Sequence, residues 1–221
     1  YGGNFMSFGI ALSGGGAKGA AHVGVLMALC ENNLIPSSVS GTSMGAIVGG
    51  LYAIGYPPEK LKEIIIKFSK NYRRYIDPCY GNYFMALMQF MSNSSITLPG
   101  FIKGDKVERY LKNLTKNIAI SSVQTPLVIP AVDLISGKTI VYSNIHPKTN
   151  NTTSNIVWKN DIPLHSAMRA SSSLPAIFYP KKINNAVLVD GGITHIIPIE
   201  LLMQAGEKNI LAINISQEYE K

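Results

Sequence analysis

The sequence predicts an α/β domain in which a mainly parallel central sheet is covered by helices on both faces. Short apolar runs alternate with longer segments whose apolar residues recur at helical spacing. The best strands are continuous apolar runs, which is typical of parallel strands buried on both faces. With 221 residues, 46% of them hydrophobic, the chain can build one sizeable core. We expect a single domain over residues 6–221, with residues 1–5 as a remnant of expression before Met6.

The first half of the chain is punctuated by glycine and proline. Residues 8–12 form an apolar run that ends in three glycines, and residues 17–32 follow with helical spacing. A second short strand ends at 39–40, and residues 46–54 continue as an apolar helix. Pro57 and Pro58 open the next helix, because proline is accommodated in a first helical turn.

The second half repeats the alternation. The run 84–91 is apolar nearly all round, which is typical of an ordinary core helix but also of an acyl-chain wall or an interfacial lid. Residues 148–155 form a polar loop. The remaining expected elements are an amphipathic helix over 104–116, paired strands at 127–132 and 139–142, a helix at 162–170, a strand at 187–189, a helix at 199–205 and a last buried strand at 210–215.

The net charge of +7 indicates either a basic surface with no specific partner or attraction to an anionic one. No long Lys/Arg run and no nucleic-acid motif is present, so a phospholipid surface or an anionic substrate is favoured over nucleic acid. No apolar run reaches the roughly 18–20 residues that span a bilayer. We therefore expect a cytoplasmic protein able to make peripheral contact with anionic membranes. Cys30 and Cys79 are expected to be reduced thiols, and no residues have metal-ligand spacing, so neither metal nor other cofactor is expected.

The strongest chemical signal is Gly41-Thr42-Ser43-Met44-Gly45, a G-x-S-x-G string between an apolar strand and an apolar helix. A strand-to-helix turn this tight leaves no room for side chains beside the serine, so Gly41 and Gly45 relieve the clash. Ser43 then projects at a helix N-terminus, where backbone N–H groups are free. The context favours a nucleophilic serine over a glycine-rich turn that only caps a helix.

A second signal is Gly14-Gly15-Gly16-Ala17-Lys18-Gly19, also between a strand and a helix. Its backbone N–H groups can converge on an anionic oxygen. The string also fits G-x-G-x-x-G, but a dinucleotide fold expects a carboxylate at the end of the next strand, where Ser40 to Ser43 stand instead. An oxyanion hole formed by this turn fits better.

The third signal is Asp190-Gly191-Gly192, directly after an apolar strand. A carboxylate at the end of a buried strand is poorly explained as a solvated surface charge. The alternative is a structural cap of the turn.

These three motifs, in this order, resemble the patatin-like phospholipases, over nearly the whole chain from Gly9 to about Ile215. Residues 131–134 with 137–138, and residues 169–175, add further matches. The resemblance implies a three-layer sandwich and a Ser–Asp dyad, with Ser43 as nucleophile and Asp190 as base. It also implies oxyanion N–H groups from the turn at Gly14–Lys18, chiefly Gly15, Gly16 and Ala17, supported by Gly19, Gly191 and Gly192. Lys18 stands where many members have arginine, and the chain ends where relatives often continue.

The implied activity is hydrolysis of fatty-acyl esters of phospholipids or lysophospholipids through an acyl-enzyme. Two alternatives are a non-catalytic scaffold of the same fold and, less favoured, a Rossmann-type nucleotide binder. His195, which stands where many members have asparagine, is the histidine that could turn the dyad into a triad. Because the resemblance implies direct contact between Ser43 and Asp190, we expect His195 to stabilise a turn instead.

Overall fold

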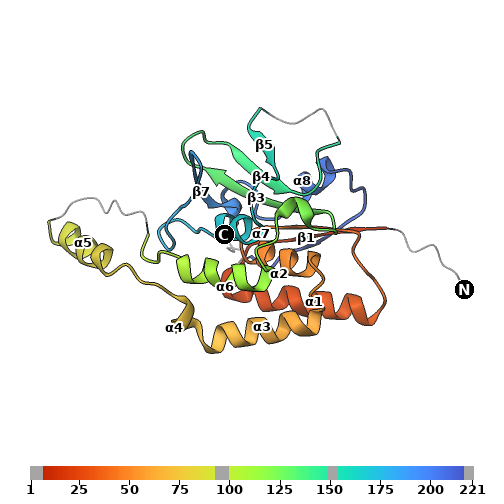
Figure 1. Ribbon diagram of the computed structural model, residues 1–221, viewed down its shortest axis with the longest axis horizontal. Coiled ribbons are helices and arrows are strands. Elements are labelled where there is room, and N and C mark those ends of the chain that lie inside the picture. Colours follow the sequence, from red (N-terminus) through yellow and green to blue (C-terminus); the bar gives the residue numbers. More distant parts are fainter. Residues whose placement is uncertain (1–6, 93–99, 149–153, 217–221) are drawn as a thin grey trace, which may run out of the picture.

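An eight-stranded mixed sheet forms the centre of the computed structural model, which describes residues 7–92, 100–148 and 154–216 (Figure 1). The main path of the sheet runs β5-β4-β3-β2-β1-β8, and β7 joins β3 and carries β6. The strands are β1 Gly9–Leu12, β2 Ser38–Gly41, β3 Leu127–Asp133, β4 Thr139–Ser143, β5 Ile156–Lys159, β6 Lys181–Ile183, β7 Ala186–Asp190 and β8 Ile210–Ile213.

Helices cover both faces of this sheet, as the alternation of elements predicts. The helices are α1 Ala20–Glu31, α2 Met44–Ala53, α3 Pro58–Lys70, α4 Tyr72–Tyr75, α5 Tyr80–Met91, α6 Asp105–Thr115, α7 Leu164–Ser171 and α8 Ile199–Gln204, with 3₁₀ turns at Gly16–Gly19 (η1), Ile120–Ser122 (η2) and Gly191–Ile193 (η3). The larger core joins α1, α2, α3, α6 and α7 to one face, where Ile10 and Ile129 are fully buried. On the other face, Leu201 and Leu202 of α8 pack against Val128 and Val141. The predicted three-layer α/β architecture is therefore confirmed.

The direction of β7 determines where Asp190, at the end of that strand, lies in the sheet. Four strand pairs are parallel, but β7 runs antiparallel to β3, as do β4 to β3 and β6 to β7. Strand β4 occupies one edge of β3, so β2 and β7 share the other edge. On that edge Ser40 is paired with Val128, whereas Asp190 is paired with Ala131. Consequently β2 and β7 point toward each other along β3, and their carboxyl ends meet.

Some local expectations are wrong. The expected buried strand at 210–215 is the edge strand β8 at Ile210–Ile213, paired with β1, and its Leu211 is 38% exposed. Strands β5 and β6 were not expected. Strand β5 is a run of only three apolar residues and one lysine directly after the polar loop, and β6 is three residues long with two lysines. Part of the expected polar loop, 149–153, lies outside the described residues. The expected helix at 17–32 begins as the 3₁₀ turn η1 before α1.

The apolar run 84–91 belongs to α5, which stands apart from the rest of the molecule in Figure 1. Met85, Met88 and Met91 are 49%, 51% and 73% exposed. These exposures contradict an ordinary core helix on that face of α5. None of the described helices is long and apolar enough to cross a membrane.

Candidate active site

Ser43 lies in the sharp turn between β2 and α2. Its backbone has φ 56° and ψ −119°, a strained conformation that residues other than glycine rarely adopt. The flanking glycines make this turn sterically feasible. A Cβ on Gly41 would collide with the carbonyl oxygen of Gly45, and a Cβ on Gly45 would lie 2.7 Å from the carbonyl oxygen of Ser13. The strained serine is thus held at the N-terminus of a buried helix.

The glycine-rich turn after β1 packs directly against this serine. A Cβ placed on Gly14 would lie 3.4 Å from the Cβ of Ser43. The N–H of Gly14 donates to the carbonyl of Ile196 at 3.0 Å, and the N–H of Lys18 donates to Gly15 at 3.1 Å. Within the described ranges, the N–H groups of Gly15, Gly16 and Ala17 donate no hydrogen bond. Three unpaired amides therefore lie in the turn that contacts Ser43.

Asp190 ends β7 and is only 3% exposed. Its carboxylate interacts with the Ser43 hydroxyl, and its Oδ1 accepts the N–H of Gly192 at 2.7 Å. Burial raises the pKa of the Asp190 carboxyl, and these two hydrogen bonds partly oppose the rise. A Cβ on Gly191 would collide with the carbonyl oxygen of Pro130, so only glycine lets η3 pack this closely on β3.

Helix α7 connects the serine to the aspartate. The Ser43 N–H donates to the Ser171 hydroxyl at 3.1 Å, while the Asp190 N–H donates to the Ser173 carbonyl at 3.0 Å. Arg169, 2% exposed, donates to the Ser173 hydroxyl at 2.5 Å and fixes the end of this helix. These residues fall within the stretch 169–175 that adds to the family resemblance, but no pattern in the sequence predicts their roles.

A buried histidine supports the glycine-rich turn from α1. His22 is fully buried, and its Nε2 lies 2.8 Å from the carbonyl oxygen of Ser13, so this nitrogen must carry the donated proton. Burial lowers the pKa of His22, which keeps the ring neutral. The bond fixes the carbonyl immediately before Gly14. No pattern in the sequence predicts this role for His22.

His195 stabilises the turn after η3. Its backbone N–H donates to Gly191 at 2.8 Å, and its carbonyl accepts the Thr42 hydroxyl at 2.7 Å. Its ring Nδ1 lies 2.9 Å from the Thr194 hydroxyl. In the part of the chain that the structure describes, no hydrogen bond joins the ring to Ser43 or Asp190. His195 therefore ties η3 to the serine turn through its backbone.

Lys18 is exposed beside the glycine-rich turn. No group of three or more His, Cys, Asp or Glu residues that could hold a metal ion occurs among residues 7–92, 100–148 and 154–216.

Known proteins resemble this chain over most of its length. The family model described as patatin-like phospholipase matches residues 10–203. An uncharacterized NTE family protein of Mycobacterium tuberculosis is 29% identical over 94% of this chain and 48% of its own length. The lysophospholipase NTE1 of Mycosarcoma maydis is 25% identical over 95% of this chain and 10% of its own. The neuropathy target esterase sws of Drosophila melanogaster is 26% identical over 96% of this chain and 13% of its own.

The fold also has a counterpart among solved structures. The crystal structure of VipD from Legionella pneumophila superposes with a TM-score of 0.56 at 17% identity, over 93% of this chain and 49% of that one. The present chain spans about half the length of the mycobacterial relative and of VipD, and much less of the other two. From its match over residues 10–203, the chain belongs to the patatin-like phospholipase family.

Proposed function

We propose that this chain is a serine hydrolase that cleaves fatty-acyl ester bonds of phospholipids or lysophospholipids. The observation that carries the proposal is the meeting of the Ser43 turn with the buried Asp190 carboxylate at the facing ends of β2 and β7, next to a turn with three unpaired amides. A nucleophile, a base and oxyanion donors are the groups that acyl transfer requires.

In the proposed mechanism, the Ser43 oxygen attacks the ester carbonyl while Asp190 accepts the serine proton. The negative charge that develops on the carbonyl oxygen is stabilised by the N–H groups of Gly15, Gly16 and Ala17. The protonated Asp190 then gives its proton to the departing alcohol. In the second step Asp190 takes a proton from the water that attacks the acyl-enzyme. It then returns this proton to the Ser43 oxygen as the acyl–serine bond breaks, which releases the fatty acid and regenerates both residues.

The environment of Ser43 supports an acyl substrate. Its chain neighbour Met44 lines an apolar cavity between α2, α3 and α6, together with Ile47, Leu51, Ile64, Ile65, Phe68, Val107, Tyr110, Leu111 and Leu114. The cavity volume is about 30 Å³, so a whole acyl chain would require these helices to separate. The relatives named as a lysophospholipase and an esterase also support an ester substrate.

A fluorophosphonate probe tests whether the chain is an enzyme or a scaffold. The probe reacts with activated serines, so we expect stoichiometric labelling of the folded protein at Ser43, located by mass spectrometry of the labelled peptide. Heat-denatured protein is the control and should not react, because the reactivity depends on the folded arrangement. Folded protein that stays unlabelled would favour the scaffold alternative.

His195→Asn should keep most of the esterase activity. Asparagine preserves the backbone bonds of residue 195 to Gly191 and Thr42, and the lost ring contacts Thr194 and not the dyad. The check is kcat on a short acyl ester, with a pH–rate profile of both proteins. A loss of a thousandfold or more in a folded variant would mean that the enzyme uses a triad.

A further inference from the structure

Most of the net charge of the chain lies in one segment. Residues 58–116 hold 11 of the 20 lysines and arginines but five of the 13 acidic residues, so this segment carries +6 of the total +7. The segment contains α3, α4, α5 and α6. The basic character is therefore a local feature of one side of the molecule.

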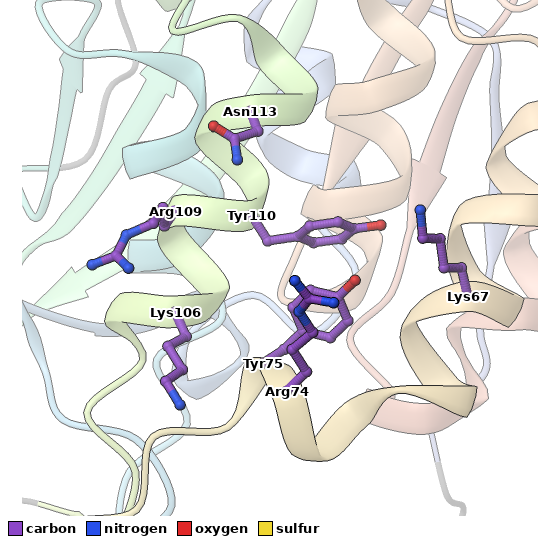
Figure 2. Close-up of a pocket in the computed structure, with 7 residues that line it drawn as sticks. All are labelled: Lys67, Arg74, Tyr75, Lys106, Arg109, Tyr110 and Asn113. Carbon is purple, nitrogen blue, oxygen red and sulfur yellow. The ribbon is translucent and has the colours of Figure 1, made fainter.

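A cavity of about 550 Å³ lies within this basic segment, between α3, α4 and α6. Its lining residues are Lys67, Arg74, Tyr75, Lys106, Arg109, Tyr110 and Asn113. Figure 2 shows Lys67 on one side of the two tyrosine rings and Lys106 and Arg109 on the other. No acidic residue belongs to this lining.

The four cations of the lining are available to a ligand. Within the described ranges, none of them takes part in an ion pair. The carboxylates of Glu63 on α3 and Glu108 on α6 are instead held by Lys60 and Lys181, each at 2.6 Å. The positive charge of the cavity is thus not neutralised by these neighbours.

The two tyrosines that line the cavity are held in place by packing between aromatic rings. Tyr75 stacks on Phe68 with ring centroids 5.0 Å apart, and Tyr110 lies 4.4 Å from Tyr75. Burial and the neighbouring Tyr75 raise the pKa of Tyr110 to about 12. Its phenol therefore stays neutral at physiological pH and brings no negative charge to the cavity.

The exposed apolar helix α5 follows α4 closely in the chain. Besides its three exposed methionines it carries Tyr80, which is 78% exposed. Asn82 anchors the first turn of α5 through hydrogen bonds to Gly100 at 2.6 Å and Tyr179 at 2.8 Å. Cations together with exposed apolar side chains form the combination that binds an anionic membrane interface.

We propose that the cavity formed by Lys67, Arg74, Lys106 and Arg109 binds the phosphate group of an anionic lipid headgroup at a membrane surface, while α5 contacts the acyl region. Arginine can bind a phosphate with two parallel hydrogen bonds, and lysine adds a mobile point charge. A nucleic acid would use the cations but would leave the exposed methionines of α5 without a role. This binding goes beyond the proposed hydrolysis and does not require it.

The test uses Ser43→Ala protein, so that hydrolysis cannot change the vesicles. Its sedimentation with phosphatidylcholine vesicles is compared with and without phosphatidic acid, whose headgroup is a bare phosphate. We expect Lys106→Gln/Arg109→Gln to weaken the phosphatidic-acid-dependent binding about tenfold, since each cation near a surface contributes to attraction. The matched control is Lys112→Gln/Lys116→Gln, which removes the same charge from α6 and the residue after it, outside the cavity. This control should change the binding less than about twofold.

Three outcomes would overturn the proposal. An equal loss of phosphatidic-acid-dependent binding in both double variants would mean that the protein is attracted to the membrane by its overall charge and has no specific phosphate site. Inorganic phosphate or glycerol 3-phosphate that binds the cavity tightly, with vesicle binding unaffected by Lys106→Gln/Arg109→Gln, would identify a free phosphate as the ligand. A single-stranded RNA that displaces the protein from vesicles, and that loses binding in the same double variant, would identify a nucleic-acid site. Circular dichroism of every variant shows whether it is folded.

Discussion

Ser43→Ala should abolish esterase activity while leaving the fold intact. Removing a nucleophile of this kind costs on the order of 10⁶ in kcat. The backbone N–H of residue 43 can still donate to Ser171, and alanine keeps the Cβ, so the turn geometry should persist. The measurements are kcat on a short acyl ester and the melting temperature.

A neighbouring serine provides the matched control for this substitution. Ser172 follows α7, and its hydroxyl donates to the carbonyl of Met168 in α7 at 2.8 Å, away from Ser43 and Asp190 in the hydrogen-bond pattern. Ser172→Ala should therefore retain activity. If Ser43→Ala protein that is free of wild-type enzyme kept more than a small fraction of the turnover, Ser43 would not be the nucleophile.

The local geometry around Ser43 was predictable from the sequence because its constraints are steric and short-range. A strand that turns into a helix within a few residues needs glycine at Gly41 and Gly45, and the collisions that a Cβ would cause are visible in the structure. The alternation of apolar runs and helical spacing similarly predicts the layered α/β fold, since each pattern reports burial within one element.

The meeting of Ser43 with Asp190 was not predictable from periodicity alone. An apolar run at 187–189 indicates a strand but not its direction, and here the strand runs antiparallel to β3. That direction brings the end of β7 toward the end of β2. The family resemblance implied this contact without giving its topological cause.

The hydrogen bonds that join α7 to Ser43 and Asp190 were also not predictable, because they link residues that are distant in the sequence. Ser171 and Ser173 contact residues 128 and 17 positions away in the sequence, and no local pattern distinguishes them from other serines near a helix end. The basic cavity also combines α3, α4 and α6. Of the adjacent residues Arg73 and Arg74, only Arg74 lines the cavity, because Arg73 instead donates to Tyr72 at 3.3 Å.

Asp190→Asn should be nearly as damaging as the loss of Ser43. The amide cannot accept the serine proton, so the serine oxygen remains a poor nucleophile. Asparagine still offers an oxygen to the Gly192 N–H, and the cap of η3 should survive. We expect a loss of at least about 10⁴ in kcat, since loss of the aspartate of a serine-protease triad costs about that much and loss of the triad base costs more.

The stability of this variant distinguishes a catalytic from a structural aspartate. The folded state raises the pKa of Asp190, so it binds the proton more tightly than the unfolded chain does. The ionised carboxylate therefore opposes folding above that pKa, and its contribution to stability falls as the pH rises through it. Asp190→Asn removes this charge and should melt at the same temperature as wild type, or higher, at pH 7. In the wild type, kcat/KM should rise with pH through the raised pKa as Asp190 ionises. A folded Asp190→Asn protein with near-normal turnover, or one that is inactive only because it unfolds, would leave Asp190 as a structural cap of η3.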